Sequence, residues 1–466
     1  MILAPQPAKY TPEPAFLELA EGFADRVEPA EFPDHIIRFR NDRWAETVGL
    51  AALDDAHWIA HFGSFEPLPG NLETPLALRY HGHQFRSYNP EIGDGRGFLF
   101  AQMRDCHGRL LDLGTKGSGQ TPWSRFGDGR LTLKGGVREV LATEMLEALG
   151  VDTSKSFSLI ETGEALERGD EPSPTRSSVL VRLSHGHIRI GSFQRLAAER
   201  DEARMRELLG YCLRHYFGEQ AGEDGSERLL THMVEGGARL ATSYMAAGFV
   251  HGVLNSDNIN ITAESFDYGP WRFTPKWEPG FTAAYFDYAG LYCFARQAEA
   301  IHWDIAQLAV SLRLIKQAEP LIAIIERFPQ LYQDAFRERM LARLGVGPRG
   351  EQEDLELLRK IEEALREGEV KIDRFFFDWR GGERRGPSPA DGAYEGEKFQ
   401  AVAATLEGYE PTTAVDHPYW FDEEPCSMHI DELEAIWARI DSDDDWSAFD
   451  AKIAAIRRMG EALRGA

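Results

Sequence analysis

The order of strand-like and helix-like segments predicts an α+β protein with two lobes and a helical C-terminal extension. Short apolar and β-branched runs dominate up to about residue 190, and long segments with helical periodicity follow them. The length of 466 residues is too great for one small core, so several structural units are expected. We therefore expect a small strand-rich lobe followed by a larger helical lobe.

The strand-rich part is predicted to contain a glycine loop, a hairpin and one helix. The glycine loop GDGRG (93–97) leads into GFLFAQM (97–103), an aromatic and aliphatic run that is typical of a strand. Turn residues follow at 105–108, and RLLDLGTK (109–116) is the returning strand. The segment GGVREVLATEMLEALG (135–150) has apolar residues at helical spacing and ends in glycine, so it predicts an amphipathic helix.

Two further strands and several long helices complete the prediction. Strands are expected at SFSLIETGE (156–164) and SSVLVRLS (177–184), and helices at 199–217, 227–247, 302–344 and 351–366. Gly, Pro and charged residues predict a flexible surface insertion at 380–397. The predicted units are an N-terminal segment (1–75), a small lobe (76–190), a helical large lobe (191–345) and a C-terminal extension (346–466).

The composition narrows the functional class. The net charge is −25, from 51 Lys and Arg against 76 Asp and Glu, which disfavours a general nucleic-acid binder. Four widely spaced cysteines predict neither a disulfide framework nor a thiolate zinc site. An import peptide and a membrane-spanning stretch are not evident, so we expect a cytoplasmic protein without a membrane partner. The sequence does not determine the oligomeric state.

Candidate phosphate contacts lie in the strand-rich part. Gly93 and Gly95 permit close approach of backbone amides to a phosphate, and Arg96 adds guanidinium donors. A glycine-rich turn before a hairpin is by itself ordinary. Lys116 ends the returning strand, and Glu139 falls on the helix that follows. This order of parts is that of a kinase small lobe, in which a glutamate holds a lysine against phosphates.

Two motifs further along the chain predict a metal-nucleotide site. HGVLNSDN (251–258) follows a long predicted helix, and FDYG (266–269) comes soon after. Kinase-like enzymes place a metal-binding asparagine and then a metal-binding aspartate in this order. Asn258 and Asp267 occupy those positions, and their oxygens are the ligands that Mg²⁺ or Mn²⁺ prefers. Either motif alone would also fit an ordinary polar turn.

One position departs from the kinase pattern. Val253 stands where a kinase has its catalytic aspartate, so the usual acceptor for a substrate proton is absent. Asp257 is the one acid of this loop that could act as a base. Arg182 and Arg189, which flank a predicted strand end, could clamp terminal phosphates. The residues alone allow a nucleotide-binding pseudokinase or an enzyme in which another phosphate is attacked.

Several long motifs resemble those of the selenoprotein O family, namely YHGHQF, NPEIGDGRG, DLGTKGSGQTPWSRFGDGR, VREVLATEML, HGVLNSDN and FDYGP. The resemblance implies a protein-kinase-like fold that binds ATP in a flipped orientation and transfers AMP to Ser, Thr or Tyr hydroxyls of other proteins. It implies ATP contacts by Gly93, Gly95, Arg96, Lys116, Asp128, Gly129, Arg182, Arg189 and Asp267. It further implies that Asn258 and Asp267 hold Mg²⁺ or Mn²⁺, and that Asp257 accepts the proton.

The alternatives are uridylyl transfer from UTP with manganese, a non-catalytic ATP-binding regulator and a small-molecule phosphotransferase. The chain also departs from the family. It ends RRMGEALRGA without a cysteine, and Ala283 stands where relatives often carry a cysteine after the metal aspartate. Redox regulation of the kind found in relatives is therefore not expected.

Overall fold

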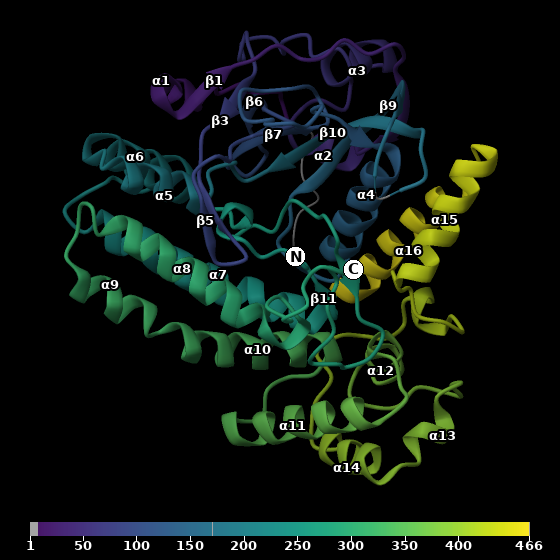
Figure 1. Ribbon diagram of the computed structural model, residues 1–466. Helices are drawn as coiled ribbons and strands as arrows, with labels where there is room; N and C mark the ends of the chain where they lie inside the picture. Colours follow the sequence, from purple (N-terminus) through teal and green to yellow (C-terminus); the bar gives the residue numbers. More distant parts are fainter. Residues whose placement is uncertain (1–7, 170, 466) are drawn as a thin grey trace.

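The computed structural model describes residues 8–169 and 171–465 of a mixed α/β protein. In these residues eight strands form one antiparallel sheet, in the upper part of Figure 1, with the order β1-β3-β6-β7-β10-β9-β2 and with β8 paired to β10. The strands are β1 (Ala24–Arg26), β2 (Ile36–Arg40), β3 (Leu76–Leu78), β6 (Leu99–Arg104), β7 (Leu110–Lys116), β8 (Leu131–Thr132), β9 (Lys155–Leu166) and β10 (Thr175–Ser184). Two small sheets pair β4 (Gly82–Gln84) with β5 (Ser87–Asn89), and β11 (Phe249–Val250) with β12 (Arg272–Phe273).

The predicted hairpin is confirmed as β6 and β7, in the centre of the sheet. Strand β7 lies between β6 and β10, and Lys116 at its end is paired with Leu180. The glycine loop closes onto this end, because Gly117 donates its N–H to the Arg96 carbonyl. Lys116 therefore ends a strand that is fixed on both sides.

The two faces of the sheet pack against different helices. Side chains alternate along β10, so Val179 and Val181 join one apolar cluster with Trp58 of α3, whereas Leu180 joins another cluster with Val140 of α4. Trp58 and Phe157 are stacked at 5.0 Å between ring centres. The helices on this part are α1 (Ala20–Phe23), α2 (Asp42–Thr47), α3 (Asp55–Phe62) and α4 (Leu133–Ala148).

The helical part lies below the sheet in Figure 1, with α7 packed against α8 and α10. Its helices are α5 (Ile190–Glu199), α6 (Glu202–Phe217), α7 (Gly225–Ala247), α8 (Gln297–Leu312), α9 (Ala318–Ile325) and α10 (Phe328–Leu344). The remaining helices are α11 (Glu351–Glu367), α12 (Ile372–Asp378), α13 (Asp391–Tyr394), α14 (Glu397–Leu406), α15 (Ile430–Asp443) and α16 (Ser447–Arg464). Helices α11 to α14 share a separate apolar cluster, whereas α15 and α16 run beside α4.

Two predicted helical segments differ from the structure, and one of them, 302–344, is divided into α8, α9 and α10. The helix expected at 199–217 begins only at Glu202, because Arg200 has a left-handed backbone that ends α5 and Asp201 caps α6. The insertion expected at 380–397 is anchored at its start, since Arg380 is buried and donates to the carbonyls of Ala342 and Arg343. Buried arginines that bind backbone carbonyls give no periodic signal in a sequence.

Within residues 8–169 and 171–465, no helix combines the length and the apolar character needed to span a bilayer. The four cysteines are unpaired.

We predict that Gly97→Ala destabilises the protein. A Cβ at Gly97 would lie 2.0 Å from the Thr115 carbonyl oxygen, so β7 would have to move away from the glycine loop. Overpacking of this kind costs roughly 1–3 kcal/mol in the free energy of unfolding, which thermal denaturation would measure. Gly392→Ala is the matched control, because a Cβ there meets nothing within 4 Å. Equal melting temperatures of the two variants would contradict the prediction.

Candidate active site

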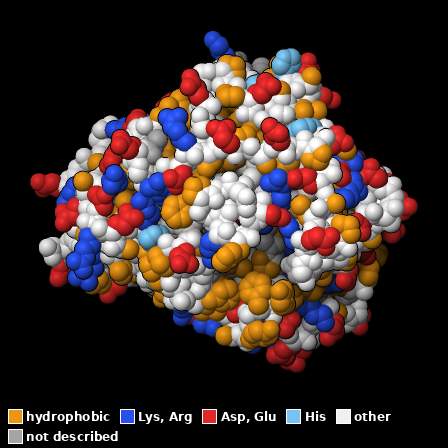
Figure 2. All heavy atoms as spheres, turned by 45° about the horizontal axis from the view of Figure 1, so that its top comes forward, with side chains coloured by type: hydrophobic (Ala, Val, Ile, Leu, Met, Phe, Trp, Pro, Cys, Tyr) orange, Lys and Arg blue, Asp and Glu red, His pale blue; other side chains and the backbone are white. Residues whose placement is uncertain are grey.

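A cavity of about 720 Å³ lies where the glycine loop, the end of β7 and the loops around residues 257 and 267 meet. Ten of the predicted site residues line it, namely Gly93, Gly95, Arg96, Lys116, Asp128, Gly129, Arg182, Arg189, Asp257 and Asp267. Its lining includes seven Lys or Arg and five Asp or Glu. This local excess of cations contrasts with the net charge of −25 and with the interspersed charges on the face in Figure 2. The cavity therefore suits an anionic ligand.

The best-defined feature of the cavity is the set of ion pairs around Lys116. The ammonium of Lys116 contacts the Glu139 carboxylate and lies 2.8 Å from Asp267 Oδ1. Lys116 and Glu139 are buried, and Glu139 stands behind the lysine rather than in the cavity wall. The predicted lysine–glutamate pair is thus present, and the second contact of Lys116, with Asp267, joins the strand-rich part to the loop of Asp267.

Asp267 is surrounded by cations. Arg182 Nη1 lies 3.4 Å from the same Oδ1 that Lys116 contacts. Burial by itself would raise the pKa of Asp267, but Lys116, Arg182 and Arg189 outweigh it and hold this pKa well below its usual range. The backbone of Asp267 is left-handed, with φ at 63°, a conformation that residues other than glycine seldom adopt. Asp267 is therefore an anion throughout the physiological pH range.

Arg189 is fixed by a different acid. Its Nη2 donates to Asp94 Oδ1 at 3.0 Å, and its Nη1 donates to the Asp257 carbonyl at 3.2 Å. The guanidinium also lies over the Tyr80 ring at 4.3 Å. The Nε atoms of both Arg189 and Arg182 are buried and have no hydrogen-bond partner among the described residues. Buried donors without partners are costly, so they indicate a ligand that supplies oxygen acceptors.

Asp257 belongs to a short 3₁₀ turn, Ser256–Asn258, at the floor of the cavity. Asn255 fixes this turn, because its Oδ1 accepts from Tyr292 Oη at 2.8 Å and from the Phe85 N–H at 3.0 Å. Burial raises the pKa of Asp257 to about 6, although Arg189 opposes the shift. Asp257 Oδ1 is buried and has no hydrogen-bond partner among the described residues. A carboxyl group of this kind can accept a proton near neutral pH.

The oxygens near Asp267 suit a divalent cation. Asn258 follows Asp257 in the same turn, and its Nδ2 donates to the Val253 carbonyl at 3.0 Å. That bond leaves the amide oxygen of Asn258 as its metal-binding atom, and Asp267 supplies a permanently charged carboxylate. Such hard oxygen donors are those that Mg²⁺ and Mn²⁺ prefer. Asn258 is absent from the residues that line the cavity, so the structure does not by itself join it to Asp267.

The remaining predicted contacts lie at the rim. Arg96 is exposed, and Asp128 is held at the mouth by Arg168, whose Nη1 lies 2.7 Å from Asp128 Oδ2. Gly129 has φ at 72°, and a Cβ there would lie 2.2 Å from the Gly119 carbonyl carbon. Only glycine fits this close approach of two backbone segments.

Two residues that line the cavity, and one buried acid near Asp257, were not predicted from the sequence. Asp94 pairs with Arg189, and the Trp123 ring covers Gly93, where a Cβ would lie 2.5 Å from its Cγ. Asp304 of α8 is buried, and burial together with the nearby Asp257 raises its pKa well above the usual range. Asp94 lies within the predicted glycine loop, so its place in the sequence could have marked it as a site residue. Trp123 and Asp304 carry no local signal, because only the fold brings Trp123 to the cavity and Asp304 near Asp257.

Known proteins resemble this chain over most of its length. A family model described as "Protein adenylyltransferase SelO" matches residues 7–390. A protein nucleotidyltransferase YdiU from Gloeobacter violaceus is 42% identical over 474 residues, which cover 96% of this chain and 95% of the relative. Another YdiU, from Synechococcus elongatus, is 50% identical over 336 residues, covering 72% of this chain and 68% of the relative.

These matches confirm the family resemblance and the predicted enzyme class, nucleotidyltransferase. The range matched by the family model contains the glycine loop, Lys116, Glu139, and the turns that carry Asp257 and Asp267. The chain therefore belongs to the family of the protein adenylyltransferase SelO.

Proposed function

We propose that this protein transfers AMP from ATP to Ser, Thr or Tyr hydroxyls of other proteins and releases pyrophosphate. The observation that carries the proposal is that a buried carboxyl group with a pKa of about 6, Asp257, shares one cavity with the Lys116–Asp267 ion pair. In this proposal the strand-rich and helical parts are the small and large lobes of a protein-kinase-like fold. The relatives are named protein nucleotidyltransferases, which supports a protein as the acceptor.

In the proposed reaction the acceptor hydroxyl oxygen attacks the α-phosphorus of ATP. A new oxygen–phosphorus bond forms, and the bond from the α-phosphorus to the oxygen that leads to the β-phosphate breaks. The electron pair of the broken bond leaves with pyrophosphate. Asp257 accepts the hydroxyl proton, which makes the oxygen a better nucleophile. Val253 cannot do so, which is why transfer of the γ-phosphate by the usual kinase arrangement is not proposed.

The cations of the cavity have distinct proposed roles. Lys116, held by Glu139, neutralises charge on the phosphates, and Arg182 and Arg189 bind the phosphates that leave. Asn258 and Asp267 would hold Mg²⁺ or Mn²⁺, which supplies Lewis-acid stabilisation of the phosphate charge when it is bound. The backbone at Gly93, Gly95 and Gly129, with Arg96 and Asp128 at the rim, completes the nucleotide site.

Two other functions fit the same cavity. Uridylyl transfer from UTP with Mn²⁺ would use the same residues, since the named relatives are described as nucleotidyltransferases without a stated nucleotide. Val253 favours a non-catalytic ATP-binding regulator, because the kinase base is missing. The donor nucleotide distinguishes uridylyl transfer from AMP transfer. The regulator differs from both because it would transfer no label.

We expect label from ATP labelled at the α-phosphate, and not from ATP labelled at the γ-phosphate, to become bound to acceptor proteins in a cell extract. Asp267→Asn should reduce this transfer by on the order of a hundredfold, as loss of one preorganised charge does. Asp334→Asn, a partly exposed site on α10, should leave it unchanged. Protein-bound γ-label would contradict AMP transfer, UTP as the better donor would favour uridylyl transfer, and ATP binding without transfer would favour the regulator.

We also expect the kcat/KM for ATP to fall about tenfold per pH unit below pH 6 and to be constant above it. The raised pKa of Asp257 leaves this base protonated below about 6, whereas Asp267 stays ionised over the whole range. Asp257→Asn should lower the rate by roughly a hundredfold or more and should remove this acid limb. A limb that persists in the variant belongs to ATP or to another group, and an unchanged profile would exclude Asp257 as the base.

A further inference from the structure

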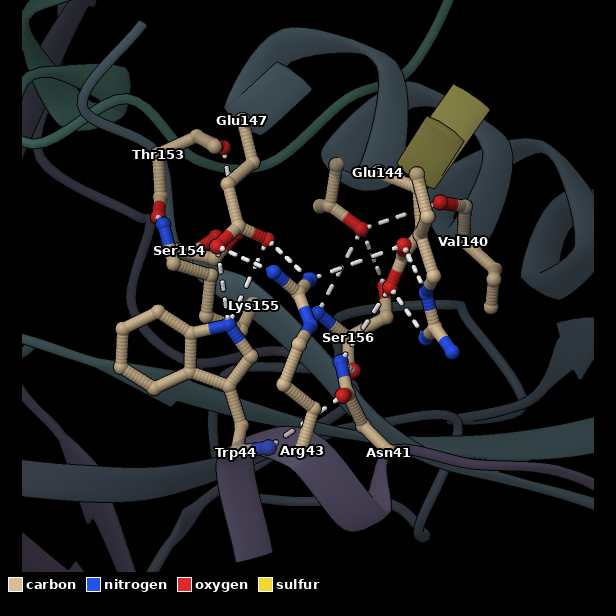
Figure 3. Close-up of polar contacts among 12 residues, drawn as sticks. Asn41, Arg43, Trp44, Val140, Glu144, Glu147, Thr153, Ser154, Lys155 and Ser156 are labelled. Atoms are coloured by element: carbon tan, nitrogen blue, oxygen red, sulfur yellow. Dashed lines mark hydrogen bonds and ion pairs between the residues drawn. The ribbon is translucent and has the colours of Figure 1, made fainter. Parts of the chain in front are cut away.

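The helix that carries Glu139 also carries two carboxylates on another face. Glu144 lies five residues, and Glu147 eight residues, after Glu139 along α4. At 100° per residue the Glu144 side chain is turned about 140° away from that of Glu139. Figure 3 shows Glu144 and Glu147 projecting from α4 towards Asn41, Arg43 and Trp44, which follow β2. Glu139 therefore faces Lys116, whereas Glu144 points towards another side of the helix.

Glu144 is a buried carboxylate that depends on the C-terminal helix. Its side chain is 2% exposed, and Arg457 of α16 donates to it from Nε at 2.8 Å and from Nη2 at 2.9 Å. Asn41 Nδ2 donates at 3.3 Å, and Arg43 Nη2 lies at 3.7 Å. The bond to Glu144 raises the pKa of Arg457, so this arginine keeps its charge. Such a bidentate bond fixes both the distance and the orientation of the Glu144 carboxylate relative to Arg457.

Helix α16 approaches α4 closely at a second point. A Cβ at Gly460 would lie 3.2 Å from Cα and Cβ of Ala148, so the end of α4 packs directly on α16. Helix α15 adds an ion pair at the start of α4, with Lys134 Nζ 2.7 Å from Glu434. The C-terminal helices thus hold α4 at its beginning, through Lys134, and over its last turn, through Glu144 and Ala148.

On its other side α4 contacts the catalytic elements. Glu139 binds Lys116, and Arg138 Nη2 donates to the carbonyls of Gly269 and Trp271, just after Asp267. A rotation of α4 would therefore move the partner of Lys116 and the loop of Asp267 together. This places α4 between the C-terminal helix and the cavity.

We infer that α16 is a positioning element of the active site. Through its two hydrogen bonds to Glu144, Arg457 fixes α4 in the rotation at which Glu139 holds Lys116 in the cavity. The inference rests on the proposed nucleotidyl transfer for its readout. Arg457 is a positioning residue and not a catalytic one, since it lies outside the cavity lining. The last helix of the chain is accordingly part of the machinery that assembles the site.

The test compares Arg457→Met with Arg458→Met in the full-length protein. Arg458 is the neighbouring arginine on α16 and pairs with Asp422 instead of α4, so the charge change is matched. We expect Arg457→Met to lower the rate of α-label transfer roughly three- to thirtyfold at a temperature where both variants are folded, as coupled positions do. Arg458→Met should match the wild type. Equal rates for the two variants would overturn the inference.

A double-mutant cycle with Glu139→Gln separates positioning from a general loss of structure. If Arg457 acts through the Lys116–Glu139 pair, Arg457→Met should cause little further loss of rate in the Glu139→Gln protein. Losses that multiply would show that Arg457 acts elsewhere and would overturn the inference. If Arg457→Met does not fold, Arg457→Lys, which keeps the charge but loses the two-pronged bond, takes its place in the cycle.

The outcome also distinguishes the inference from the proposed function. A wild-type protein that binds ATP but transfers no α-label would contradict AMP transfer alone. The wild type, Arg457→Met, Glu139→Gln and the double variant would then be compared by their affinity for ATP with Mg²⁺. Non-additive losses of affinity would support the coupling between α16 and Lys116, and additive losses would overturn it.

Discussion

The buried charge on Lys116 is the constraint on which the site depends. An ammonium group taken out of water is costly unless carboxylates compensate it, and here Glu139 and Asp267 both do. These two acids come from a helix and from a loop that is distant in the sequence. Pairing one lysine with both therefore fixes the sheet, α4 and the Asp267 loop relative to one another.

This acidic protein can still form a site for an anion, because cations are concentrated in its cavity. The chain carries an excess of 25 negative charges, yet its cavity is lined by more cations than anions. Arg182 and Arg189 keep buried Nε donors without partners among the described residues, and Asp94 and Tyr80 fix Arg189 in place. The arginines are preorganised for phosphate oxygens, because little side-chain freedom is left to lose on binding.

The position of α4 connects this site to the end of the chain. One face of the helix carries Glu139, and another carries Glu144, which binds Arg457 more than 300 residues later. Both carboxylates are buried, so neither can leave its partner without exposing an uncompensated charge to the protein interior. In the proposed function this makes the C-terminal helices part of the support of the active site.

The sequence by itself determined the local elements and the chemistry of most site residues. The hairpin that ends at Lys116, helix α4 and most later helices follow from periodicity and turn residues, because these signals act over a few neighbouring residues. The resemblance to the family's motifs implied the roles that we propose for Asp257 and Asp267. The order of Lys116, Glu139, Asn258 and Asp267 along the chain was enough to predict a nucleotide site.

Only the tertiary structure decided which charges meet. Three contacts join residues from distant segments. Arg189 pairs with Asp94, the Trp123 ring packs over Gly93, and Arg457 binds Glu144. Periodicity reports which face of a helix is apolar but not which buried carboxylate meets which arginine. Those contacts are set by packing of the whole chain, since burying a charge is tolerated only where the fold brings its partner.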